Sequence, residues 1–173
     1  MRLEKEPIQS VSRYPTVSVV IPCKNSEKTL ETCLKALLQQ TEAALEVIVV
    51  NDNSTDRTAE IAQKFPVVLK NTHLGTSAGA ARNSGAESAQ GEVVAFIDSD
   101  CEASPDWLAK IKNNFAKDPD LGAVGGRYSH PSMKSSIGKL VALEEEYCHH
   151  DRSMNPTTGN RSRPFLSVRA LAS

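Results

Sequence analysis

Several features that would mark a specialised protein class are missing from this chain of 173 residues. Its four cysteines form no C-x-x-C pair, so a zinc ribbon or a dithiol redox motif is not expected. Neither charge is in excess, with 20 Lys and Arg against 21 Asp and Glu, which gives no reason to expect nucleic acid as a partner. No stretch approaches the ~20 apolar residues of a membrane span, and no secretory signal is visible. We therefore expect a protein of the cytoplasm, or of the cytoplasmic face of a membrane.

What the chain does contain is a regular alternation of two patterns. Short apolar runs, typical of buried parallel strands, alternate with helical periodicities. The expected strands are residues 17–21, 45–50, 67–69, 93–97 and 121–124. The expected helices begin after Ser26, after Ser54 or Thr55, at Ser77 and at Ser104-Pro105, with a further helix at 135–149. This order predicts one α/β domain with a mostly parallel sheet flanked by helices.

Polar loops follow three of the expected strands. Asp98 and Asp100 come directly after the run VVAFI, and the segment Asn51 to Asp56 follows the second strand. Pro22 is expected to end the first strand, because proline cannot donate to the ladder. The carboxyl ends of parallel strands meet at one edge, where open α/β sheets bind their ligands. Two carboxylates there are typical of a Mg²⁺ or Mn²⁺ site that is completed by substrate phosphates.

Four segments, in order, resemble the family-2 glycosyltransferases, which are inverting enzymes with the GT-A fold, a Rossmann-like domain that binds nucleotide-diphosphate sugars. They are VSVVIPCKN, VVNDNSTD, GTSAGAARNSG and VVAFIDSDCEASPDWL, and together they run from about Val17 to Gly126. The resemblance implies a nucleotide-diphosphate-sugar donor, a divalent cation, and an acceptor that is a saccharide, a lipid or a protein. It also implies that Pro22 and Asn25 line the nucleotide pocket.

The same resemblance assigns roles to four further residues. Asp52 matches the acid that recognises the base, and Arg82 matches a basic residue near the diphosphate. Asp100 matches the carboxylate that binds the metal, and Asp98 supports it. An arginine suits that place because its forked guanidinium can bind phosphate in a bidentate way.

The chain also departs from the family pattern. Asn51 stands where the family usually has an acid, and Asn53 stands where it usually has glycine, although asparagine tolerates the left-handed conformation. After Asn155 no regular pattern is visible, and no Asp or Glu follows Asp151, so no general base can be assigned. We therefore expect a polar lead-in at 1–14, a nucleotide-sugar-binding domain at 15–130, and an incomplete acceptor-binding half at 131–173. Such a truncated or frameshifted chain would bind a donor but transfer its sugar poorly.

Two alternative functions stay open on the sequence alone. A non-catalytic remnant or binding module of the same fold would keep the donor site without the chemistry. A nucleotidyltransferase that makes nucleotide-sugars is disfavoured, because the loop PCKNSEKT contains no glycine. The run Cys148 to Asp151 is better explained as a polar helix end than as a metal site, since helical ligands prefer i, i+4 spacing.

Overall fold

The computed structural model describes residues 14–72, 77–118, 120–125 and a strand at 165–169. Strands and helices alternate, in the order β1 (Val17–Cys23), α1 (Leu30–Leu38), β2 (Glu46–Asn51), α2 (Thr58–Ala62), β3 (Val68–Asn71), α3 (Ala78–Ala86), β4 (Val93–Ile97), α4 (Trp107–Lys117) and β5 (Ala123–Gly125). The last strand, β6, is Phe165–Arg169. The helix expected at 135–149 falls outside the described residues.

The strands form one six-stranded sheet in the order β3-β2-β1-β4-β6-β5. β3, β2, β1 and β4 are parallel, and β6 is antiparallel to both β4 and β5. The expectation of an α/β fold with a mostly parallel sheet is therefore confirmed. The chain winds outwards from β1 through β2 to β3, and then returns to place β4 on the other side of β1. This reversal puts a topological switch point at the carboxyl ends of β1 and β4, where such sheets bind ligands.

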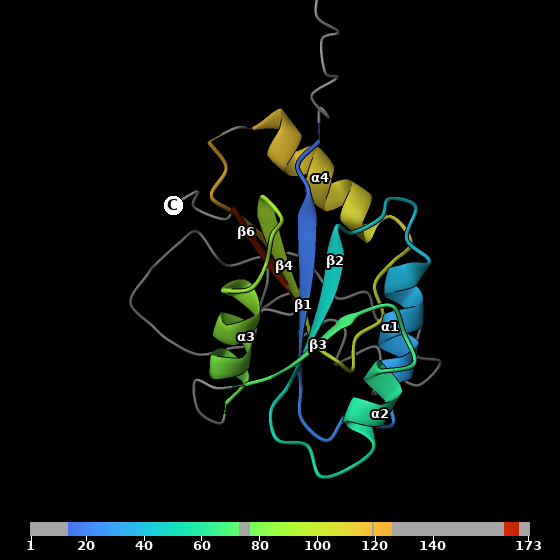
Figure 1. Cartoon of the computed structure of the whole chain (residues 1–173). Helices are drawn as coiled ribbons and strands as arrows, with labels where there is room; N and C mark the ends of the chain where they lie inside the picture. The colour runs from blue at the N-terminus through green and yellow to red at the C-terminus, as the bar shows by residue number, and fades with distance from the viewer. Residues whose placement is uncertain (1–13, 73–76, 119, 126–164, 170–173) are drawn as a thin grey trace, which may run out of the picture. The chain divides into compact units, whose positions relative to one another are not determined.

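Helices cover both faces of the sheet (Figure 1), and the alternation of side chains along β1 decides which core each residue joins. Val17, Val19 and Ile21 belong to the larger core, which includes buried residues of α1, α2 and α4. Val20 belongs to the smaller core, with Ala81 of α3. All seven residues of β1 are buried, as a strand covered on both faces must be.

β1 runs through Pro22 to Cys23, so the expectation that Pro22 ends the strand is wrong. Successive residues of a strand direct their backbone groups to opposite neighbours. The Cys23 carbonyl accepts a hydrogen bond from the Asp52 N–H, on the β2 side. Pro22 therefore faces β4, whose pairing with β1 ends at Val20 and Phe96. Its missing N–H costs no ladder bond, and the strand continues on β2 alone.

Helix starts were the least accurate of the sequence predictions. The N-cap residues are Thr29, Arg57 and Asp106 for α1, α2 and α4, rather than Ser26, Ser54 or Thr55, and Ser104. The helix expected from Ser77 is found as α3, with Ser77 as its N-cap and its side chain accepting from the Ala80 N–H. Elsewhere the expected hydroxyls serve other contacts, since Ser54 Oγ accepts from the Asn25 N–H. Short polar side chains near a helix end can satisfy loops as readily as caps.

β6 was missed altogether, because its segment shows no regular local pattern. It is held by long-range antiparallel pairing, with Phe165–Arg169 opposite Val93–Ile97 of β4. The strands at the two edges were placed to within a few residues: β3 begins at Val68 and β5 at Ala123. Within the described part of the chain, none of the helices combines the length and apolar character needed to cross a membrane.

The first testable prediction concerns α3, whose small residues allow close approach to the sheet. A Cβ added at Gly85 would lie 2.3 Å from Val20 Cγ1 and 3.1 Å from Val50 Cγ2. We expect Gly85→Ala to lower the free energy of unfolding by about 1–3 kcal/mol, the usual cost of overpacking a core. Gly79→Ala is the matched control in the same helix, because its Cβ would meet only Ser77 Oγ at 3.8 Å. Helix propensity should then stabilise the control by up to about 1 kcal/mol.

Urea denaturation of the two variants and the parent checks this pair. Equal free energies of unfolding for Gly85→Ala and Gly79→Ala would show that α3 does not pack on β1 as described.

Candidate functional site

An open cavity of about 510 Å³ lies at the carboxyl edge of the parallel strands. The loops after β1, β2 and β4 and the N-terminal half of α3 all contribute to its lining. All six site residues predicted from the sequence are among them: Pro22, Asn25, Asp52, Arg82, Asp98 and Asp100. Lys24, Ser26, Ser77 and Ser99 line the same cavity and were not predicted. The fold thus brings together residues that lie up to 78 positions apart (22 to 100).

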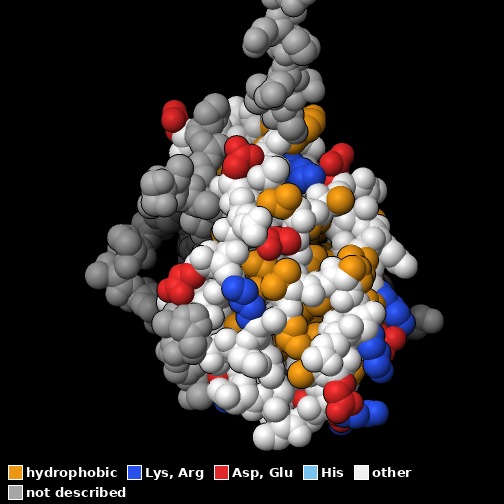
Figure 2. Space-filling model, viewed as in Figure 1, with side chains coloured by type: hydrophobic (Ala, Val, Ile, Leu, Met, Phe, Trp, Pro, Cys, Tyr) orange, Lys and Arg blue, Asp and Glu red, His pale blue; other side chains and the backbone are white. Residues whose placement is uncertain are grey.

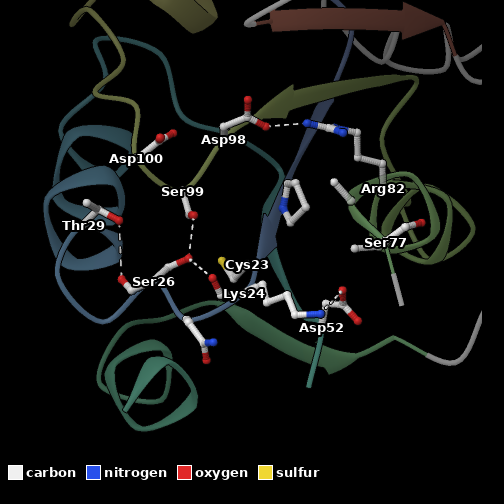
Figure 3. Close-up of a pocket in the computed structure, with 14 residues that line it drawn as sticks. Cys23, Lys24, Ser26, Thr29, Asp52, Ser77, Arg82, Asp98, Ser99 and Asp100 are labelled. Atoms are coloured by element: carbon white, nitrogen blue, oxygen red, sulfur yellow. Dashed lines mark hydrogen bonds and ion pairs between the residues drawn. The ribbon is translucent and has the colours of Figure 1, made fainter. Parts of the chain in front are cut away.

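The acids occupy two separate ends of this cavity. In the close-up, Asp98 and Asp100 lie together at one end and Asp52 lies at the other (Figure 3). Among the described residues, no three His, Cys, Asp or Glu side chains come close enough together to form a metal cluster. Asp52 therefore does not join the other two acids around one ion. The carboxylates of the cavity therefore lie in two separate places, at the Asp98–Asp100 end and at the Asp52 end.

At the first end, Asp98 is already paired. Its Oδ1 accepts a hydrogen bond from Arg82 Nη2 at 2.5 Å, and both side chains are about one-third exposed. Asp100 is exposed, and from the residues that the structure describes its carboxylate receives only a long contact from the Cys101 thiol, at 3.6 Å. A thiol is a weak donor, so Asp100 keeps most of its acceptor capacity for a ligand. Arg82, expected near a diphosphate, lies at the cavity wall with its charge partly balanced by Asp98.

At the second end, Asp52 is almost completely buried, with 3% of its surface exposed. Lys24 reaches it from the opposite loop, with 3.5 Å between Nζ and Oδ2, and the Asn53 amide donates to Oδ1 at 3.3 Å. The lysine is 56% exposed, so this ion pair is open to solvent on one side. Both contacts are long, which leaves the carboxylate able to accept a shorter hydrogen bond from a ligand N–H.

The loops after β1 and β2 are fastened to each other. Asn25 adopts a left-handed backbone conformation, with a φ of 52°, and its side-chain oxygen accepts from the Thr55 N–H. Asn53 has the same φ, which confirms that asparagine takes the left-handed conformation where the family usually has glycine. Asn51 accepts from the Ser54 N–H and donates to Asn71, and so supports the loop that carries Asp52.

Ser26 and Ser99 were missed by sequence analysis, and they link the cavity's loops. Ser26 lies after β1 and Ser99 lies between the two acids, yet their hydroxyl oxygens are 2.8 Å apart (Figure 3). Serine between two acids is common in loops, so no sequence signal distinguished Ser99. For Ser26 the expected helix cap concealed the long-range contact.

Two cysteines near the cavity, Cys23 and Cys33, are buried, and burial disfavours their thiolate forms. Burial raises the pKa of Cys23 to about 12, and hydrogen bonding to Ser99 lowers it only in part. Burial likewise raises the pKa of Cys33 to about 12. The raised pKa values keep both thiols neutral at physiological pH.

A divalent cation fits the donor chemistry at the Asp98–Asp100 end. Mg²⁺ and Mn²⁺ prefer oxygen ligands and commonly take one or two protein carboxylates, with phosphate oxygens and waters completing the shell. The cavity offers that set: one exposed carboxylate, Asp100, and one beside it, Asp98, that is partly engaged by an arginine. Over the face that Figure 2 shows, acidic and basic side chains are scattered and do not gather into a patch of one charge.

Comparison with known proteins decides the family. The chain matches glycosyl transferase family 2 over residues 18–168. It belongs to this family. The match extends beyond the four motifs to include the segment that ends in β6. This family-2 domain is 37% identical to glycosyltransferase AglE of Haloferax volcanii over 151 residues, which is 74% of this chain and 50% of AglE.

Solved structures agree on the fold. Mannosyltransferase PcManGT from Pyrobaculum calidifontis, in complex with GDP-Man and Mn²⁺, is 29% identical with a TM-score of 0.61, over 67% of this chain and 36% of that protein. TarS 1-349 of S. aureus, in complex with UDP-GlcNAc, is 32% identical with a TM-score of 0.54, over 69% and 38% of the two chains. The family-2 domain spans between 17% and 50% of the length of the curated relatives it matches.

Proposed function

We propose that this family-2 glycosyltransferase domain binds a nucleotide-diphosphate sugar along the cavity, with the base at Asp52 and the diphosphate at Asp98 and Asp100. The observation that carries the proposal is the convergence of Asp52, Arg82, Asp98 and Asp100 on one open cavity at the switch point of the sheet. The acid at one end suits a base N–H, and the two acids at the other suit a cation. The bound GDP-Man, UDP-GlcNAc and Mn²⁺ of the two similar structures support this arrangement.

In this proposal Asp100 holds Mg²⁺ or Mn²⁺ and Asp98 assists. When bound, such an ion supplies charge stabilisation to a departing diphosphate. Arg82 stands beside the same acids, where its guanidinium can donate to phosphate oxygens as well as to Asp98. Asp52 accepts a hydrogen bond from the base and is held in place by Lys24 and Asn53. Pro22 and Asn25 line the cavity, and the Asn25 side chain holds the loop after β1 to the loop after β2.

The reaction proposed is single-step transfer of the sugar to an acceptor hydroxyl, with inversion at the anomeric carbon. The acceptor is a saccharide, a lipid or a protein. Deprotonation of its hydroxyl requires a general base, which we do not assign to any of the described residues. The role proposed for the cavity is therefore limited to binding the nucleotide-sugar donor.

A thermal-shift screen of the full chain tests the proposal. The ligands are UDP, GDP, CDP and ADP, each with MnCl₂ or with EDTA. A ligand that binds only the folded state must raise the apparent stability. We expect at least one diphosphate to raise Tm, and to raise it more with Mn²⁺ than without. No shift with any of the four would contradict a nucleotide-diphosphate site.

A further inference from the structure

We infer that Ser26 is a positioning residue for the metal-binding turn, acting through the hydroxyl of Ser99 on the orientation of Asp100. The inference rests on the proposed function and names a residue that neither the motifs nor the family resemblance indicated. Its basis is a hydrogen bond that joins the loop after β1 to the centre of the D-x-D turn.

Ser26 is fixed firmly enough to serve as an anchor. It is only 8% exposed, and its N–H donates to Thr58 Oγ1 at 2.7 Å. Its carbonyl accepts from the N–H groups of Thr29 and Leu30 at the start of α1. Its hydroxyl lies 3.4 Å from the Lys24 carbonyl and 2.8 Å from Ser99 Oγ. A hydroxyl both donates and accepts, so Ser26 can donate to Lys24 while it accepts from Ser99.

Three other contacts of the turn act on Asp98, while the Cys23 thiol also hydrogen-bonds to Ser99. Arg82 binds the Asp98 carboxylate, the Cys33 thiol lies 3.7 Å from the Asp98 carbonyl, and the Cys101 N–H donates to that same carbonyl at 3.0 Å. These contacts come from α3, α1 and the turn itself. The Ser26 contact acts one residue further on, at Ser99, directly before Asp100.

Asp100 needs such support because its own side chain has little. The carboxylate is exposed, and among the described residues its hydrogen-bond partner is the weak thiol donor of Cys101. Its direction therefore follows from the backbone of the turn. Groups that orient a ligand from behind typically change metal affinity by about 10–100-fold when they are lost, and a single neutral hydrogen bond accounts for about three- to tenfold. At the other end of the cavity, the side-chain contacts of Asp52 come from Lys24 and Asn53 and not from Ser99.

The test is calorimetric titration of the full chain with UDP and GDP, each in MnCl₂ and in EDTA. The quantity compared is the metal-dependent gain, the ratio of the two affinities. We expect Ser26→Ala and Ser99→Ala each to reduce this gain by about three- to tenfold, with the affinity in EDTA unchanged. The double variant should be no worse than either single one, because both changes remove the same contact. Ser88→Ala is the control, since that hydroxyl bonds only α3 carbonyls, away from the cavity.

The possible outcomes distinguish a failure of the proposed function from a failure of the role inferred for Ser26. A parent chain without a metal-dependent gain overturns the proposed function and this inference with it. A parent with the gain, together with serine variants that keep it, overturns the inference alone. A fall in EDTA affinity equal to the fall in Mn²⁺ affinity also overturns it, because the hydroxyl would then contact the nucleotide itself. If Ser26→Ala does not fold, Ser99→Ala, which changes a partly exposed loop residue, decides the matter.

Discussion

Replacing Asp100 with alanine is expected to remove the metal-dependent gain in nucleotide affinity, a loss of at least about tenfold, or 1.4 kcal/mol. The side chain is exposed, lines the cavity and makes no strong contact with the part of the chain that the structure describes. Its loss should therefore leave the fold intact, which thermal unfolding of the variant checks. Calorimetric titration with UDP or GDP, in MnCl₂ and in EDTA, measures the gain directly.

Glu102→Ala is the matched control for this experiment. Glu102 is an exposed acid two positions further along the same loop, and it does not line the cavity. It should keep the full metal-dependent gain. If Asp100→Ala binds nucleotide and Mn²⁺ as well as the parent does, the assignment of the metal to the D-x-D turn is wrong.

The second large effect is expected from Asp52→Asn, which should weaken nucleotide binding even in EDTA. Asparagine keeps the size of the side chain but loses the charge-assisted hydrogen bond to the base. That loss corresponds to about 1.5–3 kcal/mol, or roughly ten- to a hundredfold in affinity. Because Asp52 lies at the opposite end of the cavity from Asp100, the metal-dependent gain should remain (Figure 3).

Lys24→Met separates base recognition from the ion pair that Asp52 makes with Lys24. If Asp52 contacts the base, Lys24→Met should weaken binding in EDTA by much less than Asp52→Asn does. Equal losses in the two variants would mean that Asp52 serves only to hold Lys24. An unchanged EDTA affinity in Asp52→Asn would show that this loop does not contact the base.

Much of the fold could be predicted from local pattern, because a parallel sheet buried on both faces leaves continuous apolar runs in the sequence. VSVVI and VVAFI predicted the two strands that flank the switch point. β6 could not be predicted in this way, since it is stabilised by pairing with β4, about 70 positions away. The continuation of β1 through Pro22 depends on where its pairing with β4 ends, which is also a long-range property.

Five of the predicted site residues gather in one cavity because they lie at or just after the carboxyl ends of β1, β2 and β4, and Arg82 reaches the same cavity from α3. What local reasoning could not supply was how these residues contact each other. The pairing of Arg82 with Asp98, of Lys24 with Asp52 and of Ser26 with Ser99 joins separate loops. For Ser26 a helix cap was the obvious local role, and tertiary contact overrode it.

The most direct test of the account is anomalous diffraction at the manganese edge, from crystals of this chain grown with Mn²⁺ and UDP or GDP. The account predicts an anomalous peak within coordination distance of the Asp100 carboxylate and the diphosphate, with the base beside Asp52. A peak at any other site, or a nucleotide bound with its base at the Asp98–Asp100 end, would contradict it.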